Sequence, residues 1–330
     1  MTPAALRSFL DGVVREGVRW SVMLWGAPGI GKSSVVAQVA QAHDLSLIDL
    51  RLSQLAPTDL RGLPIPVEGV TRWAPPEFLP RAGRGVLFLD EINLAPPALQ
   101  GVAQQLVLDR RVGSYTVPEG WFVWAAGDRK EDHASVFDMP RPLSNRFMHL
   151  EVSVDLDSFR AHAIARGFHE RIVAFLSYRP SLLHRIDPQR PAWPSPRSWE
   201  MADALLRAGL DLAPAVGAPA AGEFDAFCKV YDALPDLDAI LRGDAVAAPE
   251  ELSARYATTL ALALRADANG AVHALRWVQR AYPAEWLQLF LHAALERLRA
   301  KGAVGPLVAA IARDPELMAA QTSLQRMLRS

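Results

Sequence analysis

The residues best suited to chemistry form a glycine-rich run, GAPGIGKS, at residues 26–33. This run fits the pattern G-x-x-x-x-G-K-[ST], and it lies between an apolar segment and a helical pattern, which is the context that the motif requires. Glycines let the backbone curve so that its amides converge on phosphate oxygens, Lys32 adds a cation, and the Ser33 hydroxyl can ligate Mg²⁺. The run therefore predicts a loop that binds the phosphates of a nucleotide.

A second pair of candidate residues, Asp90 and Glu91, directly follows the apolar segment at residues 86–89. If this segment is a buried strand, both carboxylates lie at the carboxyl end of a sheet, where α/β proteins bind their ligands. Asp90 would then hold the magnesium shell, and Glu91 would polarise the water that attacks the terminal phosphate. Together with the glycine-rich run, the two acids predict hydrolysis of a nucleoside triphosphate.

The elements that position these residues alternate between short apolar runs and helical patterns, which is typical of parallel strands joined by crossover helices. We expect strands at residues 21–25, 47–52, 86–90, 121–126 and 149–154, and helices at residues 2–15, 32–42 and 97–108. The predicted fold class is therefore α/β, a P-loop NTPase with a parallel five-stranded sheet and helices on both faces.

Two hairpins are expected to interrupt this alternation. Residues 64–67 and 70–73 flank Glu68-Gly69, and residues 110–112 and 115–117 flank Gly113-Ser114, so each pair of short strands turns at a glycine. The turn chemistry by itself leaves open whether either hairpin has a purpose beyond surface decoration.

The second half of the chain shows apolar residues three and four apart, which predicts helices. Ser195 followed by Pro196 is typical of an N-cap and a proline at the first helical position. A stretch rich in Ala, Pro and Gly at residues 212–222 is expected to separate two helical blocks. The predicted domains are an α/β nucleotide-binding domain at 1–155, a helical lid at 156–245 and a helical C-terminal extension at 246–330.

Composition excludes several classes of protein. The chain has 35 Lys and Arg against 36 Asp and Glu, so its formal charge of -1 provides no general attraction to nucleic acid or to anionic membranes. Its one cysteine, Cys228, cannot form an internal disulfide or a zinc cluster, which favours a reducing compartment. No apolar run approaches the roughly 20 residues needed to span a bilayer. We therefore expect a cytoplasmic protein.

Several further runs occur in a fixed order, and with GAPGIGKS they resemble AAA+ ATPases, and within these the MoxR family, over about residues 20–205. These runs are LSQLAPTDLRGLP at 52–64, GVLFLDEINLAPP at 85–97, WAAGDRKED at 124–132, PLSNRFMHLEV at 142–152 and WPSPRSWE at 193–200. The resemblance implies that the nucleotide is ATP, bound with Mg²⁺ between the sheet and a helical lid.

The resemblance also implies roles for individual residues. The polar residue after the fourth strand, Asp128, matches the sensor 1 position, Arg146 matches the arginine that acts on a neighbouring subunit's nucleotide, and Arg197 matches the sensor 2 arginine of the lid. The expected catalytic residues are Glu91, Asp128, Arg146 and Arg197. The expected nucleotide-contacting residues are Gly26, Ala27, Pro28, Gly29, Ile30, Gly31, Lys32, Ser33, Ser34 and Arg197. The expected Mg²⁺ ligands are Ser33 and Asp90.

Asp128 departs from the family pattern, in which this position is an asparagine. Asparagine can donate a hydrogen bond to phosphate, whereas an ionised aspartate can only accept one and repels phosphate. From the sequence we expect Asp128→Asn to raise the hydrolysis rate with little change in ATP affinity.

The resemblance further implies a homo-oligomer, a six-membered ring, whose face or pore both hairpins would line. Trp73 is then a candidate for gripping a partner, with local packing as the alternative. The implied function is that of a chaperone that remodels a partner protein, one with a von Willebrand factor A domain. Two alternatives remain open, a nucleotide-gated scaffold with little hydrolysis and a nucleic-acid-stimulated AAA+ motor.

Overall fold

The structure, a computed structural model, describes residues 1–132, 136–300, 302–317 and 320–321. The chain divides into two compact units, Met1–Val154 and Asp155–Ser330, and each is described by itself. The last residues of the expected C-terminal extension, 322–330, lie outside the described residues.

The first unit is built on a five-stranded sheet in the order β2-β5-β8-β1-β9, and every neighbouring pair is parallel. The strands are β1 (Ser21–Trp25), β2 (Ser46–Arg51), β5 (Gly85–Asp90), β8 (Trp121–Gly127) and β9 (Phe147–Glu151). Strands β1, β5 and β8 are almost wholly buried, as expected for a parallel sheet that is covered on both faces. The predicted parallel sheet is confirmed.

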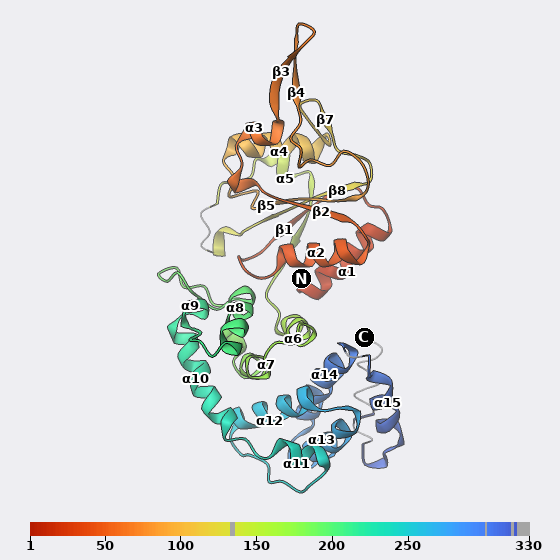
Figure 1. Cartoon of the computed structure of the whole chain (residues 1–330), viewed down its shortest axis with the longest axis vertical. Coiled ribbons are helices and arrows are strands. Elements are labelled where there is room, and N and C mark those ends of the chain that lie inside the picture. The colour runs from red at the N-terminus through yellow and green to blue at the C-terminus, as the bar shows by residue number, and fades with distance from the viewer. Residues whose placement is uncertain (133–135, 301, 318–319, 322–330) are drawn as a thin grey trace. The chain divides into compact units, whose positions relative to one another are not determined.

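Helices cover the sheet on both faces, with α1 (Pro3–Arg15) and α2 (Lys32–Ala42) on one side and α3 (Pro57–Arg61) and α4 (Pro97–Leu108) on the other (Figure 1). Four apolar residues bury one stripe of α4 against the sheet, Leu99, Val102, Ala103 and Leu106. The glycine-rich run begins directly after β1, and its last two residues, Lys32 and Ser33, are the first two of helix α2.

The fifth strand differs from its expected range. It begins at Phe147 and ends at Glu151, whereas the sequence suggested residues 149–154. Pairing with β1 sets these limits, because Ser21 lies opposite Phe147 and Trp25 opposite Glu151. The sequence pattern could not show where the partner strand ends, and it extended the strand into the connection to the next unit.

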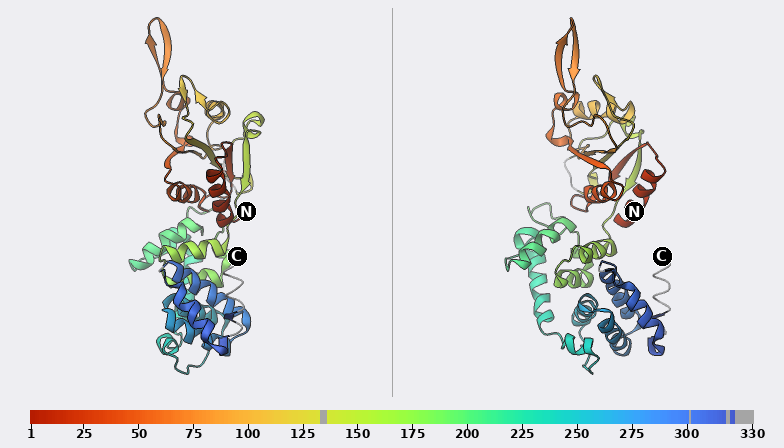
Figure 2. Two further views of the ribbon diagram at one scale, coloured as in Figure 1. Left: turned by 90° about the vertical axis from the view of Figure 1, so that its right-hand side faces the viewer. Right: turned by 45° about the vertical axis from the view of Figure 1, so that its right-hand side comes forward.

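Both expected hairpins are confirmed. Strands β3 (Leu63–Val67) and β4 (Val70–Ala74) form a ribbon that projects from the sheet unit (Figure 2), and β6 (Arg111–Val112) and β7 (Tyr115–Thr116) form a shorter one. At the tip of the longer ribbon, Glu68 and Gly69 have φ values of 50° and 77°. Two consecutive positive φ values are those of a type I′ turn, whose twist matches that of the strands it joins.

The second unit is helical. Its helices are α6 (Leu156–Ala165), α7 (Glu170–Tyr178), α8 (Pro196–Arg207), α9 (Ala213–Val216), α10 (Ala218–Asp232), α11 (Leu237–Arg242), α12 (Leu252–Arg265), α13 (Ala268–Ala281), α14 (Ala284–Ala300) and α15 (Val304–Arg313). The predicted start of α8 is confirmed, because the Ser195 hydroxyl accepts a hydrogen bond from the Ser198 amide and Pro196 follows the cap. Helix α12 packs against both α7 and α14, so residues expected in the lid and in the extension share one compact unit.

The stretch at 212–222 was expected to be a separator, and the structure corrects this. It contains α9 and the first turn of α10, and the two helices are divided by Gly217 with a φ of 81°. Pro214 and Pro219 lie in the first turns of these helices, where an amide has no intrahelical acceptor and its loss costs little. The prolines therefore mark helix starts and not a break between blocks.

Candidate functional site

The glycine-rich run forms a loop at the carboxyl end of β1. Gly29 and Gly31 have φ values of 79° and 96°, which glycine adopts at little cost. A Cβ atom at Gly26 would lie 2.6 Å from the Val152 carbonyl oxygen and 2.6 Å from Ile30 Cδ1, so the backbone approaches too closely for any side chain there. The motif is thus placed between a strand and a helix N-terminus, as the sequence predicted.

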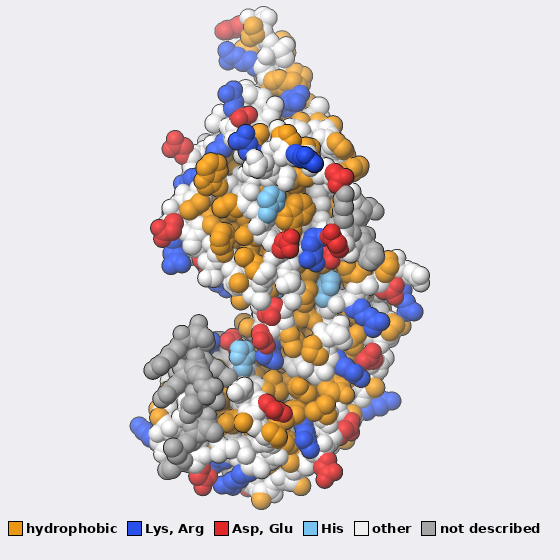
Figure 3. Space-filling model, turned by 180° about the vertical axis from the view of Figure 1, so that it is seen from behind, with side chains coloured by type: hydrophobic (Ala, Val, Ile, Leu, Met, Phe, Trp, Pro, Cys, Tyr) orange, Lys and Arg blue, Asp and Glu red, His pale blue; other side chains and the backbone are white. Residues whose placement is uncertain are grey.

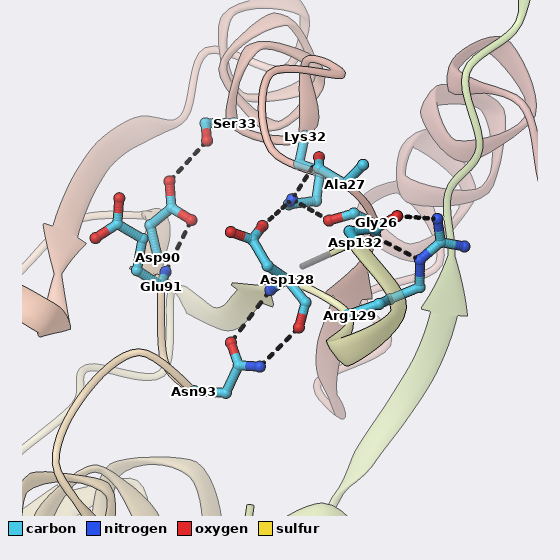
Figure 4. A network of polar contacts seen from close by, with 10 residues as sticks. All are labelled: Gly26, Ala27, Lys32, Ser33, Asp90, Glu91, Asn93, Asp128, Arg129 and Asp132. Atoms are coloured by element: carbon cyan, nitrogen blue, oxygen red, sulfur yellow. Dashed lines mark hydrogen bonds and ion pairs between the residues drawn. The ribbon is translucent and has the colours of Figure 1, made fainter. Parts of the chain in front are cut away.

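Lys32 lies inside this loop and is only 9% exposed. Its ammonium donates hydrogen bonds to the carbonyl oxygens of Gly26 at 2.6 Å and Ala27 at 3.1 Å, and to Asp128 Oδ1 at 2.8 Å (Figure 4). The two carbonyl bonds draw the ammonium back against its own loop. A buried cation is therefore held where the loop amides and the start of α2 converge, which favours an anionic ligand.

Ser33 and Asp90 meet across the site, although they come from α2 and the end of β5. The Ser33 hydroxyl donates to Asp90 Oδ2 at 2.7 Å, and Asp90 Oδ1 accepts from the Glu91 amide at 2.9 Å. A hydroxyl and a carboxylate are the oxygen ligands that Mg²⁺ takes from proteins, and the ion obtains its other ligands from phosphate and water. The two residues predicted as magnesium ligands therefore fit that ion.

Several acidic side chains lie near this edge of the sheet. Burial and the charges of Asp90 and Glu91 raise the pKa of Asp49 on β2, and the Arg51 guanidinium partly offsets this. Within the described residues, no group of three or more His, Cys, Asp or Glu side chains is arranged to hold a metal ion by itself. A divalent cation here would therefore be shared between the protein and the phosphates of the nucleotide.

Glu91 adopts an unusual backbone conformation with a φ of 56°. This left-handed region costs a residue other than glycine about 1–2 kcal/mol. The Glu91 carboxylate accepts a short hydrogen bond from the Ser53 hydroxyl, which follows β2. Ser53 is thus a site residue that the sequence analysis missed. Its only sequence signal was its place in the LSQLAP run, where nothing indicates that it faces a residue 38 positions away.

Asn93 is a second residue that sequence reasoning missed. It is 3% exposed, its Nδ2 donates to the Asp128 carbonyl oxygen at 2.7 Å, and its Oδ1 accepts from the Asp128 amide at 3.1 Å. A Cβ at Gly127 would lie 2.4 Å from the same Oδ1, so a glycine is required there. Asn93 thereby orients the backbone of Asp128 and aims its carboxylate at Lys32 (Figure 4). The next residue, Arg129, is instead paired with Asp132.

Among the described residues, neither of the two arginines expected to act on the nucleotide makes a side-chain hydrogen bond or ion pair with this cluster. Arg146 is exposed between α5 (Arg141–Ser144) and β9, and among the described residues no ion pair or side-chain hydrogen bond joins it to a partner. Arg197 is exposed in the first turn of α8, in the helical unit. The structure thus brings together Lys32, Ser33, Asp90, Glu91 and Asp128, and the roles of both arginines remain predictions.

The contact between Asp128 and Lys32 changes what is expected of Asp128→Asn. Asparagine can still accept a hydrogen bond from Lys32, but it removes a negative charge beside the ammonium that would contact phosphate. Two like charges about 5 Å apart near a protein surface repel by roughly 1–3 kcal/mol. We therefore expect Asp128→Asn to bind Mg·ATP about tenfold more tightly and also to hydrolyse it faster.

Titration calorimetry and steady-state phosphate release measure the two effects separately. Asp132→Asn is the matched control, because it removes a nearby carboxylate that pairs with Arg129 and not with Lys32. Weaker binding together with slower turnover in Asp128→Asn would show that the site needs the carboxylate.

Comparison with known proteins agrees with this geometry. Residues 21–121 match the family model of the AAA domain of the dynein-related subfamily. Two relatives named Midasin match part of the chain. The protein from Giardia intestinalis is 28% identical over 142 residues, which is 40% of this chain and 3% of that protein. The one from Dictyostelium discoideum is 36% identical over 107 residues, 30% of this chain and 2% of that protein. The chain thus matches only a small part of either relative.

Solved structures with low similarity include a variant of RuvB from Thermotoga maritima and a putative ATPase from Cytophaga hutchinsonii. The first has a TM-score of 0.37 and 16% identity, over 95% of this chain and 89% of that chain. The second has a TM-score of 0.36 and 14% identity, over 94% of this chain and 88% of that chain. By sequence, residues 21–121 match an AAA domain, and a parallel five-stranded sheet with a mostly helical second unit is the arrangement of the AAA+ P-loop NTPase fold.

Proposed function

We propose that this AAA-type chain is a magnesium-dependent ATPase that couples ATP hydrolysis to conformational change in a partner protein. The observation that carries the proposal is the convergence of Lys32, Ser33 and Asp90. The Ser33 hydroxyl contacts the Asp90 carboxylate at the end of β5, and the ammonium of the adjacent Lys32 is buried in the loop after β1, where Gly26 leaves no room for a side chain. This is the set of groups that a magnesium-bound triphosphate requires.

Each residue of the site has a separate role in hydrolysis. Lys32 and the loop amides bind the phosphates, while Ser33 and Asp90 supply oxygen ligands to Mg²⁺, which neutralises charge on the phosphates when it is bound. Glu91 lies beside Asp90 and provides the base that orients and deprotonates the attacking water. The Ser53 hydroxyl holds the Glu91 carboxylate, and Asn93 holds the backbone of Asp128.

In this proposal, ATP hydrolysis requires the subunits to assemble, because it depends on an arginine from a neighbouring subunit. The transition state concentrates negative charge on the terminal phosphoryl oxygens, and guanidinium groups stabilise that charge. Arg146, which is exposed and has no ion-pair partner among the described residues, would reach the nucleotide of a neighbouring subunit in a ring, which we propose to be hexameric. Arg197 would contact the nucleotide from the lid.

The family and the kind of partner that we propose rest on the sequence resemblance. We infer a MoxR-like chaperone in the cytoplasm that acts on a partner with a von Willebrand factor A domain. No described helix has the length and apolar character to cross a membrane. A second candidate is a nucleotide-gated scaffold with little hydrolysis, and the observation that favours it is the Asp128 carboxylate bound to Lys32.

Titration calorimetry of the full chain with Mg·ATP tests the proposal. We expect binding by the wild type and a roughly 10- to 100-fold weaker affinity for Lys32→Ala, because a charge-assisted contact contributes about 1.5–3 kcal/mol. Lys229→Ala, which removes an exposed lysine from α10, is the control and should bind as the wild type does. A folded wild-type chain that releases no heat with Mg·ATP would rule out the proposed function.

A further inference from the structure

A polar pocket lies between the two hairpins, apart from the nucleotide site. Its volume is about 730 Å³, and it is lined by the end of α3, by β4, by the end of α4 and by β6 and its turn. The lining residues are Arg61, Trp73, Gln105, Asp109, Arg111, Val112 and Gly113. None of them takes part in the proposed binding or hydrolysis of ATP.

Direct contacts between the hairpins hold the walls of this pocket in place. The Ser114 hydroxyl donates a short hydrogen bond to the Trp73 carbonyl oxygen. A Cβ at Gly113 would lie 3.2 Å from Trp73 Cβ and 3.4 Å from the Arg61 carbonyl oxygen, and Gly113 has a φ of 56°. A glycine thus permits the close approach of the two ribbons at the wall of the pocket.

Two guanidinium groups face this pocket without a carboxylate partner. Arg61 lies over the Trp73 ring with its Cζ 5.4 Å from the ring centroid, and Arg111 is exposed on β6. In the part of the chain that the structure describes, neither side chain has an ion pair. A cation–π contact with an indole restrains a guanidinium and leaves N–H groups available, which suits bidentate binding of a carboxylate.

From these features we propose that the pocket binds an acidic side chain of a partner polypeptide. Arg61 and Arg111 would hold the carboxylate, and the Trp73 ring would contact the apolar atoms next to it. This inference does not depend on the proposed ATPase activity, because binding at the pocket can be measured without nucleotide.

The charges around the pocket favour a polypeptide over nucleic acid. Asp109 also lines the pocket, so a phosphate group bound there would meet a carboxylate. On the face shown in Figure 3, basic and acidic side chains are interspersed over the sheet unit. Binding along a nucleic-acid strand requires a continuous basic groove.

Two prolines in β3 indicate that a partner chain would be recognised by side chains and not by strand pairing at the β3 edge. A two-residue turn makes Val67 and Val70 a hydrogen-bonded pair, so Pro64 and Pro66 occupy the positions whose amides would point outward from the ladder. Proline has no amide hydrogen to donate there. This edge therefore cannot add a strand in the usual way, so a partner chain at this ribbon would be recognised through side chains such as those of the pocket.

The test is fluorescence anisotropy with the full chain and a labelled short peptide in which glutamate alternates with leucine. We expect this peptide to bind and its glutamine counterpart to bind at least about tenfold more weakly. Arg61→Ala and Arg111→Ala should each weaken binding about tenfold, and Asp109→Asn should strengthen it a few-fold. Arg111→Glu should abolish binding, and because Arg111 is exposed, this change disturbs no packing.

Arg72→Ala is the matched control. Arg72 lies on β4 next to Trp73, and alternation along the strand places it on the opposite face of the ribbon, so its loss should leave binding within about twofold. The proposal is wrong if neither peptide binds, if both bind equally, or if Arg72→Ala weakens binding as much as Arg61→Ala. Binding of oligothymidylate in place of the acidic peptide, with the same dependence on Arg61 and Arg111, would identify a nucleic-acid site and also overturn it.

Discussion

Glu91→Gln is expected to lower steady-state ATP hydrolysis by about 100-fold or more while the chain still binds Mg·ATP. A positioned general base accelerates proton transfer by roughly 10²- to 10⁴-fold, and glutamine cannot accept the proton. The substitution keeps the size of the side chain and an oxygen that can accept the Ser53 hydrogen bond, so the surroundings should change little. Phosphate release measures the loss, and calorimetry checks that binding remains.

Ser53→Ala is a useful comparison for this prediction. It leaves the carboxylate in place but removes its hydrogen-bond donor, so it should change turnover far less than Glu91→Gln does. Full activity in Glu91→Gln would contradict the assignment of the base. If neither the wild type nor Glu91→Gln hydrolyses ATP, even with a protein partner present, a nucleotide-gated scaffold describes this chain better than an ATPase.

Arg146→Ala should reduce hydrolysis by about 10³-fold, because an arginine finger contributes on the order of 10³ to 10⁵ in related NTPases. ATP affinity of the isolated subunit should stay close to that of the wild type, because among the described residues Arg146 makes no hydrogen bond or ion pair with Lys32 or Asp90 of its own chain. The measurement is phosphate release at protein concentrations that favour assembly. Arg141→Ala, an exposed arginine at the start of α5, is the control.

Mixing two inactive variants distinguishes action on a neighbour from action within one chain. A subunit with Glu91→Gln still carries Arg146, and a subunit with Arg146→Ala still carries Glu91, so an interface between them can contain one complete site. Recovered hydrolysis in co-expressed, doubly tagged assemblies would support action on the neighbouring nucleotide. Mixed assemblies without any recovery would instead place the role of Arg146 within its own chain or in folding.

The sequence predicted the main elements of the sheet unit closely. Helices α2 and α4 begin and end at the residues expected, and β1 does so as well. These elements have strong local signals, because each combines an apolar period with a boundary residue such as the glycine before Lys32 or the proline at Pro97. The expected start of β9 was wrong because its limits depend on pairing with β1 and not on its own residues.

The site was predicted less completely than the fold. Local patterns identified Lys32, Ser33, Asp90 and Glu91, since each lies in a motif whose chemistry depends on residues near it in sequence. They did not show that Asp128 binds Lys32, from which it is 96 positions away. The two supporting residues, Ser53 and Asn93, were missed for the same reason, because the local sequence around a polar residue does not indicate which distant residue it contacts.

The sequence by itself therefore determined the phosphate-binding loop, the acids that end β5 and the order of the sheet unit's strands and helices along the chain. These features depend on backbone conformation, apolar period and charge, and all three act over a few residues. The tertiary structure alone decided which side chains meet, including Lys32 with Asp128 and the pocket between the hairpins. The contact between Lys32 and Asp128 forms because strand order in a parallel sheet brings the ends of distant segments to one edge, and the pocket forms because two hairpins distant in sequence contact each other.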